Sequence, residues 1–180
     1  MRTLRIFVLF LFSLPQFVQA QLTLTQVRES YFSRVDHGCK ALEVSKKFDK
    51  HPPTDVVLTA YHGASLAAAA ACVGNPMDKL KYFRRGKQLI EEAVMKQPNE
   101  LEIRFLRFAT QTKAPSFLGY TANIDVDRQF ILKQLSNCHR AKENAEISRH
   151  ISEFMLESGQ LTAKESAELN KTIKIKNAER

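Results

Sequence analysis

The stretch DVVLTAYHGASLAAAAACV, from Asp55 to Val73, decides the fold class. It has no charged residue after Asp55, and it is rich in alanine, the strongest helix former. Thr54 or Asp55 can cap its N-terminus, and Gly74-Asn75-Pro76 ends it. Because alanine contributes little to membrane insertion, the stretch predicts a buried helix rather than a membrane span.

Helical periodicity continues after this stretch. Leu80, Phe83, Ile90 and Val94 form an apolar stripe that predicts a helix over 77–97. Gly86 lies near this stripe, although glycine inside a helix lowers helix stability by about 1 kcal/mol relative to alanine. A close helix crossing would explain why glycine occupies this position. The next helix, expected over 100–113, is apolar on two faces and should be central.

The flanking segments are helical as well. Apolar residues at helical spacing predict a first helix around Tyr31, a short second helix with Ser45 and Phe48 directed inward, and a sixth helix opened by Asp125 or Asp127. A further stripe over 147–155 and a capping box at Thr162–Glu165 predict the last two, with fraying in the basic tail over 171–176. We expect an all-α fold of about six to eight helices, packed as antiparallel hairpins.

The segment Leu89–Glu100 is similar to a junction between tetratricopeptide repeats. Ala93 lies five residues before Pro98 and seven residues after Gly86. The small residues and the closing proline in the second helix of such a repeat have the same spacings. This resemblance implies tetratricopeptide-like hairpins. The central segment, including Glu102–Phe108 and Pro115–Tyr120, also resembles a group of exported bacterial proteins of uncharacterised activity, which implies export and a helical domain.

Residues 1–20 have the parts of a cleavable secretory signal. Met1–Arg5 is basic, Ile6–Leu14 is apolar, and Ala20 precedes the expected cleavage site. The apolar run is too short to span the roughly 30 Å hydrocarbon core as a helix. We therefore expect cleavage rather than an uncleaved anchor, no integral span in the mature protein, and a periplasmic or secreted location.

The remaining chain divides into a helical tetratricopeptide-like domain over 21–140 and a C-terminal hairpin with a basic tail over 141–180. Ser136–Asn144 is the expected linker. Removal of Arg2 and Arg5 with the signal lowers the formal net charge from +8 to +6. The basic residues are spread along the chain without a dense block, so we expect no nucleic-acid partner.

An exported chain can form a disulfide. Three pairings of Cys39, Cys72 and Cys138 are possible, and Cys72, after an alanine run, favours a buried thiol. His37 and His139 lie near two of these cysteines, but the spacings match no zinc module, so we expect no metal site.

No catalytic or cofactor motif emerges, and we expect no cofactor. His62 and Ser65 are three residues apart, but the second glycine of a nucleophile elbow is missing. Glu91 and Glu92 are adjacent and should be solvated. Lys79–Lys87 is basic and predicts a solvated helix face.

Four polar or amphipathic residues in apolar surroundings are the candidate binding residues: Tyr61, Arg104, Arg107 and Tyr120. Two arginines one helical turn apart can clamp a carboxylate or phosphate. The alternative is internal pairing, for example of Arg104 with Glu100.

These patterns favour an exported, non-enzymatic module that binds a protein or peptide partner in the cell envelope. The alternative is a domain that binds a small anionic ligand, or an enzymatic domain. Either would use a groove that contains Arg104 and Arg107.

Overall fold

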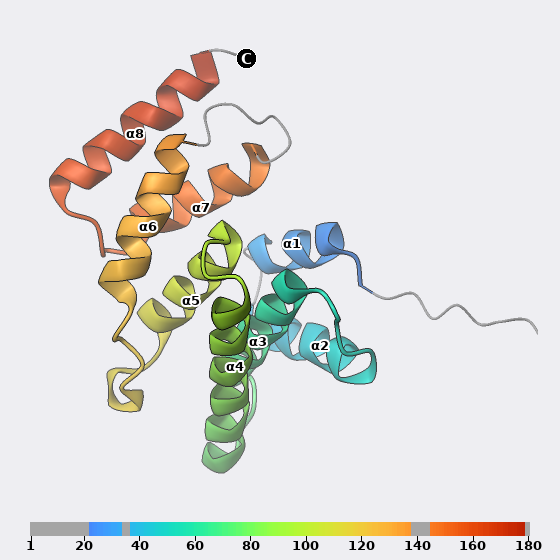
Figure 1. The fold of residues 1–180 in the computed structure, drawn as a ribbon. Helices are drawn as coiled ribbons and strands as arrows, with labels where there is room; N and C mark the ends of the chain where they lie inside the picture. Colours follow the sequence, from blue (N-terminus) through green and yellow to red (C-terminus); the bar gives the residue numbers. More distant parts are fainter. Residues whose placement is uncertain (1–21, 34–36, 138–144, 179–180) are drawn as a thin grey trace, which may run out of the picture.

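The computed structural model describes residues 22–33, 37–137 and 145–178, which form eight α-helices and one short 3-10 helix but no strand (Figure 1). The elements in chain order are α1 (Leu24–Phe32), α2 (His37–Lys50), α3 (Val56–Ala69), α4 (Pro76–Lys96), α5 (Leu101–Lys113), η1 (Ser116–Leu118), α6 (Ile124–Asn137), α7 (Ala145–Glu157) and α8 (Ala163–Ala178). The predicted all-α class is therefore confirmed. The predicted signal, Cys138, His139 and the boundary at 140–141 lie outside the described residues.

Polar side chains cap the N-termini of α3 and α8 at the positions that the sequence predicts. Asp55 accepts a hydrogen bond of 2.8 Å from the backbone N–H of Leu58 at the start of α3. At the start of α8, the backbone N–H of Thr162 donates to the Glu165 carboxylate at 2.8 Å, and the Thr162 hydroxyl accepts from the Glu165 N–H at 3.2 Å. Both interactions satisfy N–H groups that have no partner within the helix. The capping box is confirmed, but α8 continues to Ala178, beyond the point where fraying was expected.

The backbones of the antiparallel helices α3 and α4 approach each other closely at Gly63 and Gly86. A Cβ atom on Gly86 would lie 2.5 Å from the carbonyl oxygen of Gly63 and 2.7 Å from the backbone nitrogen of Ala67. A Cβ atom on Gly63 would lie 2.7 Å from the carbonyl oxygen of Gly86. The close crossing predicted from Gly86 is confirmed, and Gly63 is its counterpart on α3.

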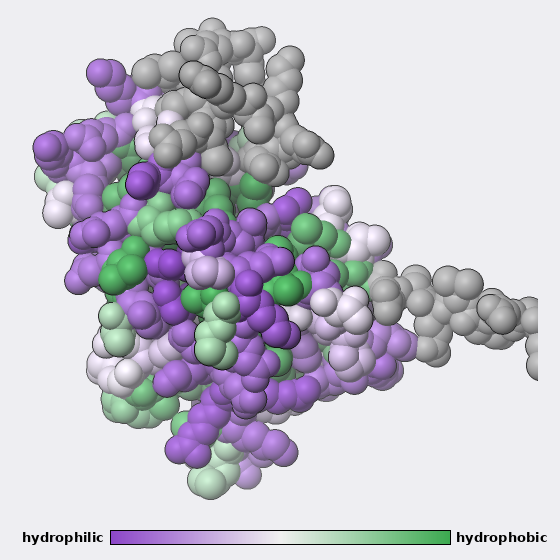
Figure 2. Space-filling model, in the orientation of Figure 1, coloured by the Kyte–Doolittle hydropathy of each residue, from purple (hydrophilic) through white to green (hydrophobic). Residues whose placement is uncertain are grey.

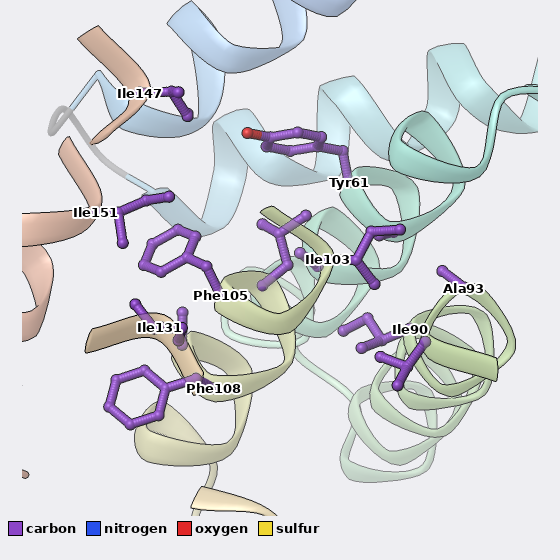
Figure 3. Packing of buried hydrophobic residues seen from close by; sticks show 14 of the residues in the cluster. Tyr61, Ile90, Ala93, Ile103, Phe105, Phe108, Ile131, Ile147 and Ile151 are labelled. Carbon is purple, nitrogen blue, oxygen red and sulfur yellow. The ribbon is translucent and has the colours of Figure 1, made fainter. Parts of the chain in front are cut away.

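Helix α5 is central, as its two apolar faces predict. Figure 1 shows α5 between the α2–α4 part of the molecule and the α6–α8 part. Figure 3 shows Phe105 and Phe108 beside Ile151 and Ile131, with Ile90 of α4 on the other side of α5. All five side chains are fully buried. A helix with two buried faces joins the two parts of the fold into one core.

The C-terminal helices belong to this same core. Ile147, Ile151 and Met155 of α7 are buried in one cluster with the central residues of α3, α4 and α5. The ring of Phe154 lies 5.3 Å from that of Phe105 in an edge-to-face contact. Residues 145–178 therefore bury their apolar stripe against α5 and its neighbours.

A disulfide joins Cys39 on α2 to Cys72, just after α3, with 5.0 Å between their Cα atoms. The prediction of a buried thiol at Cys72 is wrong, because the turn after α3 brings it beside the first turn of α2. Only the fold could select this pairing, since it depends on how α2 packs against α3.

None of the helices in the described part of the chain combines the length and apolar character needed to cross a membrane.

Candidate functional site

Three of the four predicted binding residues meet at one place, where they bind acidic side chains of the protein itself. Arg107 donates to both carboxylate oxygens of Asp127 on α6, at 2.7 and 2.9 Å. Arg104, one turn earlier on α5, donates to the same carboxylate and, at 3.1 Å, to the carbonyl oxygen of Pro98. Asp127 is 0% exposed. One fully buried carboxylate therefore holds both arginines.

Glu91 on α4 extends this network to Tyr120. Its carboxylate accepts from Arg107 at 3.0 Å and from the Tyr120 hydroxyl at 2.6 Å. Burial raises the pKa of Tyr120, and the neighbouring Glu91 raises it further. Burial lowers the pKa of Arg107, but its hydrogen bonds with the two carboxylates more than offset this and raise it. Tyr120 is therefore neutral and Arg107 charged at neutral pH.

These contacts correspond to internal pairing rather than an open anion clamp. Arg104 pairs with Asp127 and not with Glu100, because a buried carboxylate needs cationic partners more than an exposed one does. Glu91 was expected to be solvated, but its side chain is only 32% exposed and is shared between two partners. The donors of Arg104 and Arg107 are thus committed within the fold.

Tyr61 belongs to a second, separate network. Its hydroxyl donates to the Glu102 carboxylate on α5 at 2.8 Å. Arg28 on α1 donates to both oxygens of the same carboxylate, from Nε at 2.9 Å. Burial raises the pKa of Tyr61, and Glu102 raises it further, while the hydrogen bond to Glu102 raises the pKa of Arg28. This network ties α1 and α3 to α5.

His62 contacts α2 rather than Ser65. Its Nε2 atom is 3.2 Å from Asp49, which also pairs with Arg85 at 2.8 Å. Its ring stacks on Phe48 with 5.1 Å between centroids. Burial lowers the pKa of His62, and Asp49 only partly opposes this. No hydrogen bond joins His62 to Ser65 in the described part of the chain, so the two do not form a nucleophile–base pair.

A cleft of about 290 Å³ opens between α1, α2, α3, α5 and α7. Its apolar lining residues are Val27, Tyr31, Phe32, Ala41, Val44, Ala68 and Phe154. Its polar lining residues are Ser30, Lys40, Ser65, Lys113, His150, Glu153, Glu157 and Ser158. We call this site the α1–α7 cleft. It combines an aromatic floor with charged side chains of both signs.

The exposed charges of the lining stand at the mouth of the α1–α7 cleft. Lys40, Lys113 and Glu157 are exposed, whereas Tyr31 and Phe154 are half-buried. The Lys113 ammonium lies 5.6 Å from the centre of the Phe154 ring, a cation–π distance. Burial raises the pKa of Tyr31, so its hydroxyl stays protonated. An apolar group with polar flanks fits this arrangement.

The sequence patterns did not reveal the α1–α7 cleft. Tyr31 and Phe154 lie on stripes that predict core positions, and α1 and α7 do form part of the core. The lining comes from five helices between residues 24 and 157, so no local motif marks it.

No group of three or more His, Cys, Asp or Glu side chains in the described ranges is arranged to hold a metal ion. Cys39 is bonded to Cys72 and cannot serve as a thiolate ligand.

Comparison with known proteins gives no match to this chain, whether with protein-family models, curated proteins or solved structures. The fold and the α1–α7 cleft therefore carry the functional proposal.

Proposed function

We propose that this chain is an exported, non-enzymatic module that binds a protein or peptide partner, and that an apolar side chain of the partner enters the α1–α7 cleft. The observation that carries this proposal is the cleft itself, with Tyr31, Phe32 and Phe154 as an aromatic floor. Aromatic residues are enriched where partner side chains anchor at interfaces.

The size of the α1–α7 cleft favours one large side chain as the occupant. Its volume, about 290 Å³, is close to the lower end, roughly 300 Å³, of pockets that enclose small ligands. The mouth carries Lys40, Lys113 and Glu157, which suit the mixed polar flanks of a peptide. The occupant is therefore a peptide segment with an aromatic or large aliphatic residue.

The committed contacts of Arg104 and Arg107 support a structural role for these side chains. A groove that binds small anions requires cationic donors free to reach the ligand, and these donors are shared between Asp127 and Glu91. The α1–α7 cleft, rather than the arginine pair, is thus the binding site in our proposal. The Cys39–Cys72 disulfide supports export, because disulfides persist in oxidising compartments.

Site-specific photo-crosslinking tests the proposal. A photoreactive residue in place of Lys40 at the mouth of the cleft should give one specific protein adduct in the native envelope fraction. The same residue in place of Lys171, exposed on α8, should not give that adduct. Mass spectrometry of the recovered protein should show that it begins at Gln21. A chain that retains Met1 would contradict cleavage of the signal after Ala20.

A blocking substitution distinguishes the cleft from the surrounding surface. Ala68 lines the cleft on α3, so Ala68→Trp should fill it and abolish the adduct. Ala167 is exposed on α8, and Ala167→Trp is the matched control that should leave the adduct unchanged. Survival of the adduct in Ala68→Trp, or no adduct at all from position 40, would overturn the proposal.

A further inference from the structure

Helices α2 and α4 hold most of the net positive charge of the chain. Their sequences contain ten Lys and Arg residues and five Asp and Glu residues. All ten basic side chains are exposed. The net charge of the two helices together is therefore +5, and the net charge of residues 21–180 is +6. Most of the net positive charge of the chain thus lies on these two helices.

A surface ion pair links the two helices, and α3 packs against both of them. Arg85, near the middle of α4, pairs with Asp49, in the last turn of α2, at 2.8 Å. Lys46 and Lys50 flank Asp49 on α2, while Lys81 lies one turn before Arg85 and Arg84 directly before it. We call Lys46, Lys50, Lys81, Arg84 and Arg85 the α2–α4 basic face. Figure 2 shows a predominantly hydrophilic surface over α4.

Most of this charge is not neutralised within the fold. Asp49 is engaged by Arg85 and His62, and Glu91 binds Arg107 and Tyr120. Among the residues that the structure describes, Lys46, Lys50, Lys81 and Arg84 have no ion-pair partner. These four cations are therefore available to an external anion.

The α2–α4 basic face combines its charge with an exposed apolar side chain. Met77 on the first turn of α4 is 72% exposed and lies one turn before Lys81. Basic side chains next to an exposed apolar residue suit an anionic bilayer, where the charges meet lipid headgroups and the apolar group enters the interface. A polyanion would pair with the charges but would gain nothing from Met77.

We propose that the α2–α4 basic face binds the surface of a membrane that contains anionic phospholipid. None of its five residues lines the α1–α7 cleft, so the protein would bind a membrane and a peptide partner through different residues. Binding should be electrostatic in the main and should weaken as salt is added.

Vesicle co-sedimentation of the protein lacking residues 1–20 tests this proposal. The protein should sediment with vesicles of phosphatidylglycerol and phosphatidylcholine in equal parts, but not with phosphatidylcholine alone. The triple variant Lys46→Gln, Lys81→Gln, Arg84→Gln should weaken partitioning by about a hundredfold, because each basic side chain near an anionic surface contributes to binding. All three side chains are exposed, and circular dichroism should show unchanged helicity.

The control has the same charge change at a distant place. Lys164, Lys171 and Lys174 are exposed on α8, at the far end of the molecule from α4 (Figure 1). Their triple substitution to Gln should leave partitioning within about threefold of the unmodified protein. Equal loss in both triple variants would show that net charge alone drives binding and would overturn the assignment. Absence of binding to the mixed vesicles, or capture of an acidic protein without vesicle binding, would also overturn it.

Discussion

Two buried carboxylates organise the polar interior of this protein. Asp127 holds Arg104 and Arg107, and Glu102 holds Arg28 and Tyr61. Asp127 joins α5 to the next α-helix, α6, whereas Glu102 joins α5 to the distant helices α1 and α3. A buried charge is tolerated only when it is paired and hydrogen-bonded, and loss of one partner leaves the other uncompensated.

Replacement of Asp127 should therefore be strongly destabilising. In Asp127→Ala, both arginines lose their shared acceptor inside the fold, and we expect the free energy of unfolding to fall by about 3–5 kcal/mol. Urea unfolding followed by circular dichroism measures this loss.

Asp125 provides the matched control on the same helix. Its side chain is 83% exposed and pairs with Arg128 at the surface. Asp125→Ala should change the free energy of unfolding by less than about 1 kcal/mol. Similar losses in the two variants would contradict the structural role of the Asp127 network.

At the scale of the elements, α3 and α4 depend on glycine for their contact. Gly63 and Gly86 bring the two backbones together where any side chain would meet a carbonyl oxygen. The close approach explains why α4 carries a glycine in its middle, which is otherwise unfavourable in a helix.

A methyl group at this crossing should force the helices apart. Gly86→Ala gains up to about 1 kcal/mol of helix propensity, but its Cβ meets backbone atoms of α3 that cannot rotate away. We expect a net loss of about 1–3 kcal/mol in the free energy of unfolding, measured by urea titration.

Gly74 is the comparison position, because a Cβ atom there would meet nothing within 4 Å. Gly74→Ala should leave stability nearly unchanged. A gain of stability in Gly86→Ala would show that the crossing has room for a methyl group and would refute the close contact.

At the scale of the whole molecule, one core extends from α1 to α8, and a covalent link reinforces its edge. The Cys39–Cys72 bond closes a loop with a sequence separation of 33. Its residues adjoin Lys40, Ala41 and Ala68 of the α1–α7 cleft, so the bond also fixes the wall that α2 and α3 contribute.

Removal of this bond should destabilise the fold. By loop entropy, a Cys39→Ser, Cys72→Ser variant should lose about 3–4 kcal/mol of unfolding free energy. Urea unfolding with and without reducing agent provides the measurement. The unmodified protein should respond to the reductant and the double variant should not. An equal response in both would contradict the pairing.

From sequence alone we could predict the all-α class, the approximate bounds of α3, α4 and α5, a cap for α3 at Thr54 or Asp55, the Thr162–Glu165 capping box and the close crossing at Gly86. These features depend on residues within one or two helical turns, where propensity, periodicity and capping act directly. The tertiary structure alone decided the acidic partners of Arg104 and Arg107, the Cys39–Cys72 pairing, and the α1–α7 cleft. Each of these depends on which helices meet, since Asp127 lies 23 residues from Arg104 and the cleft draws on five helices. Local patterns do not encode such contacts, because they arise only after the helices pack.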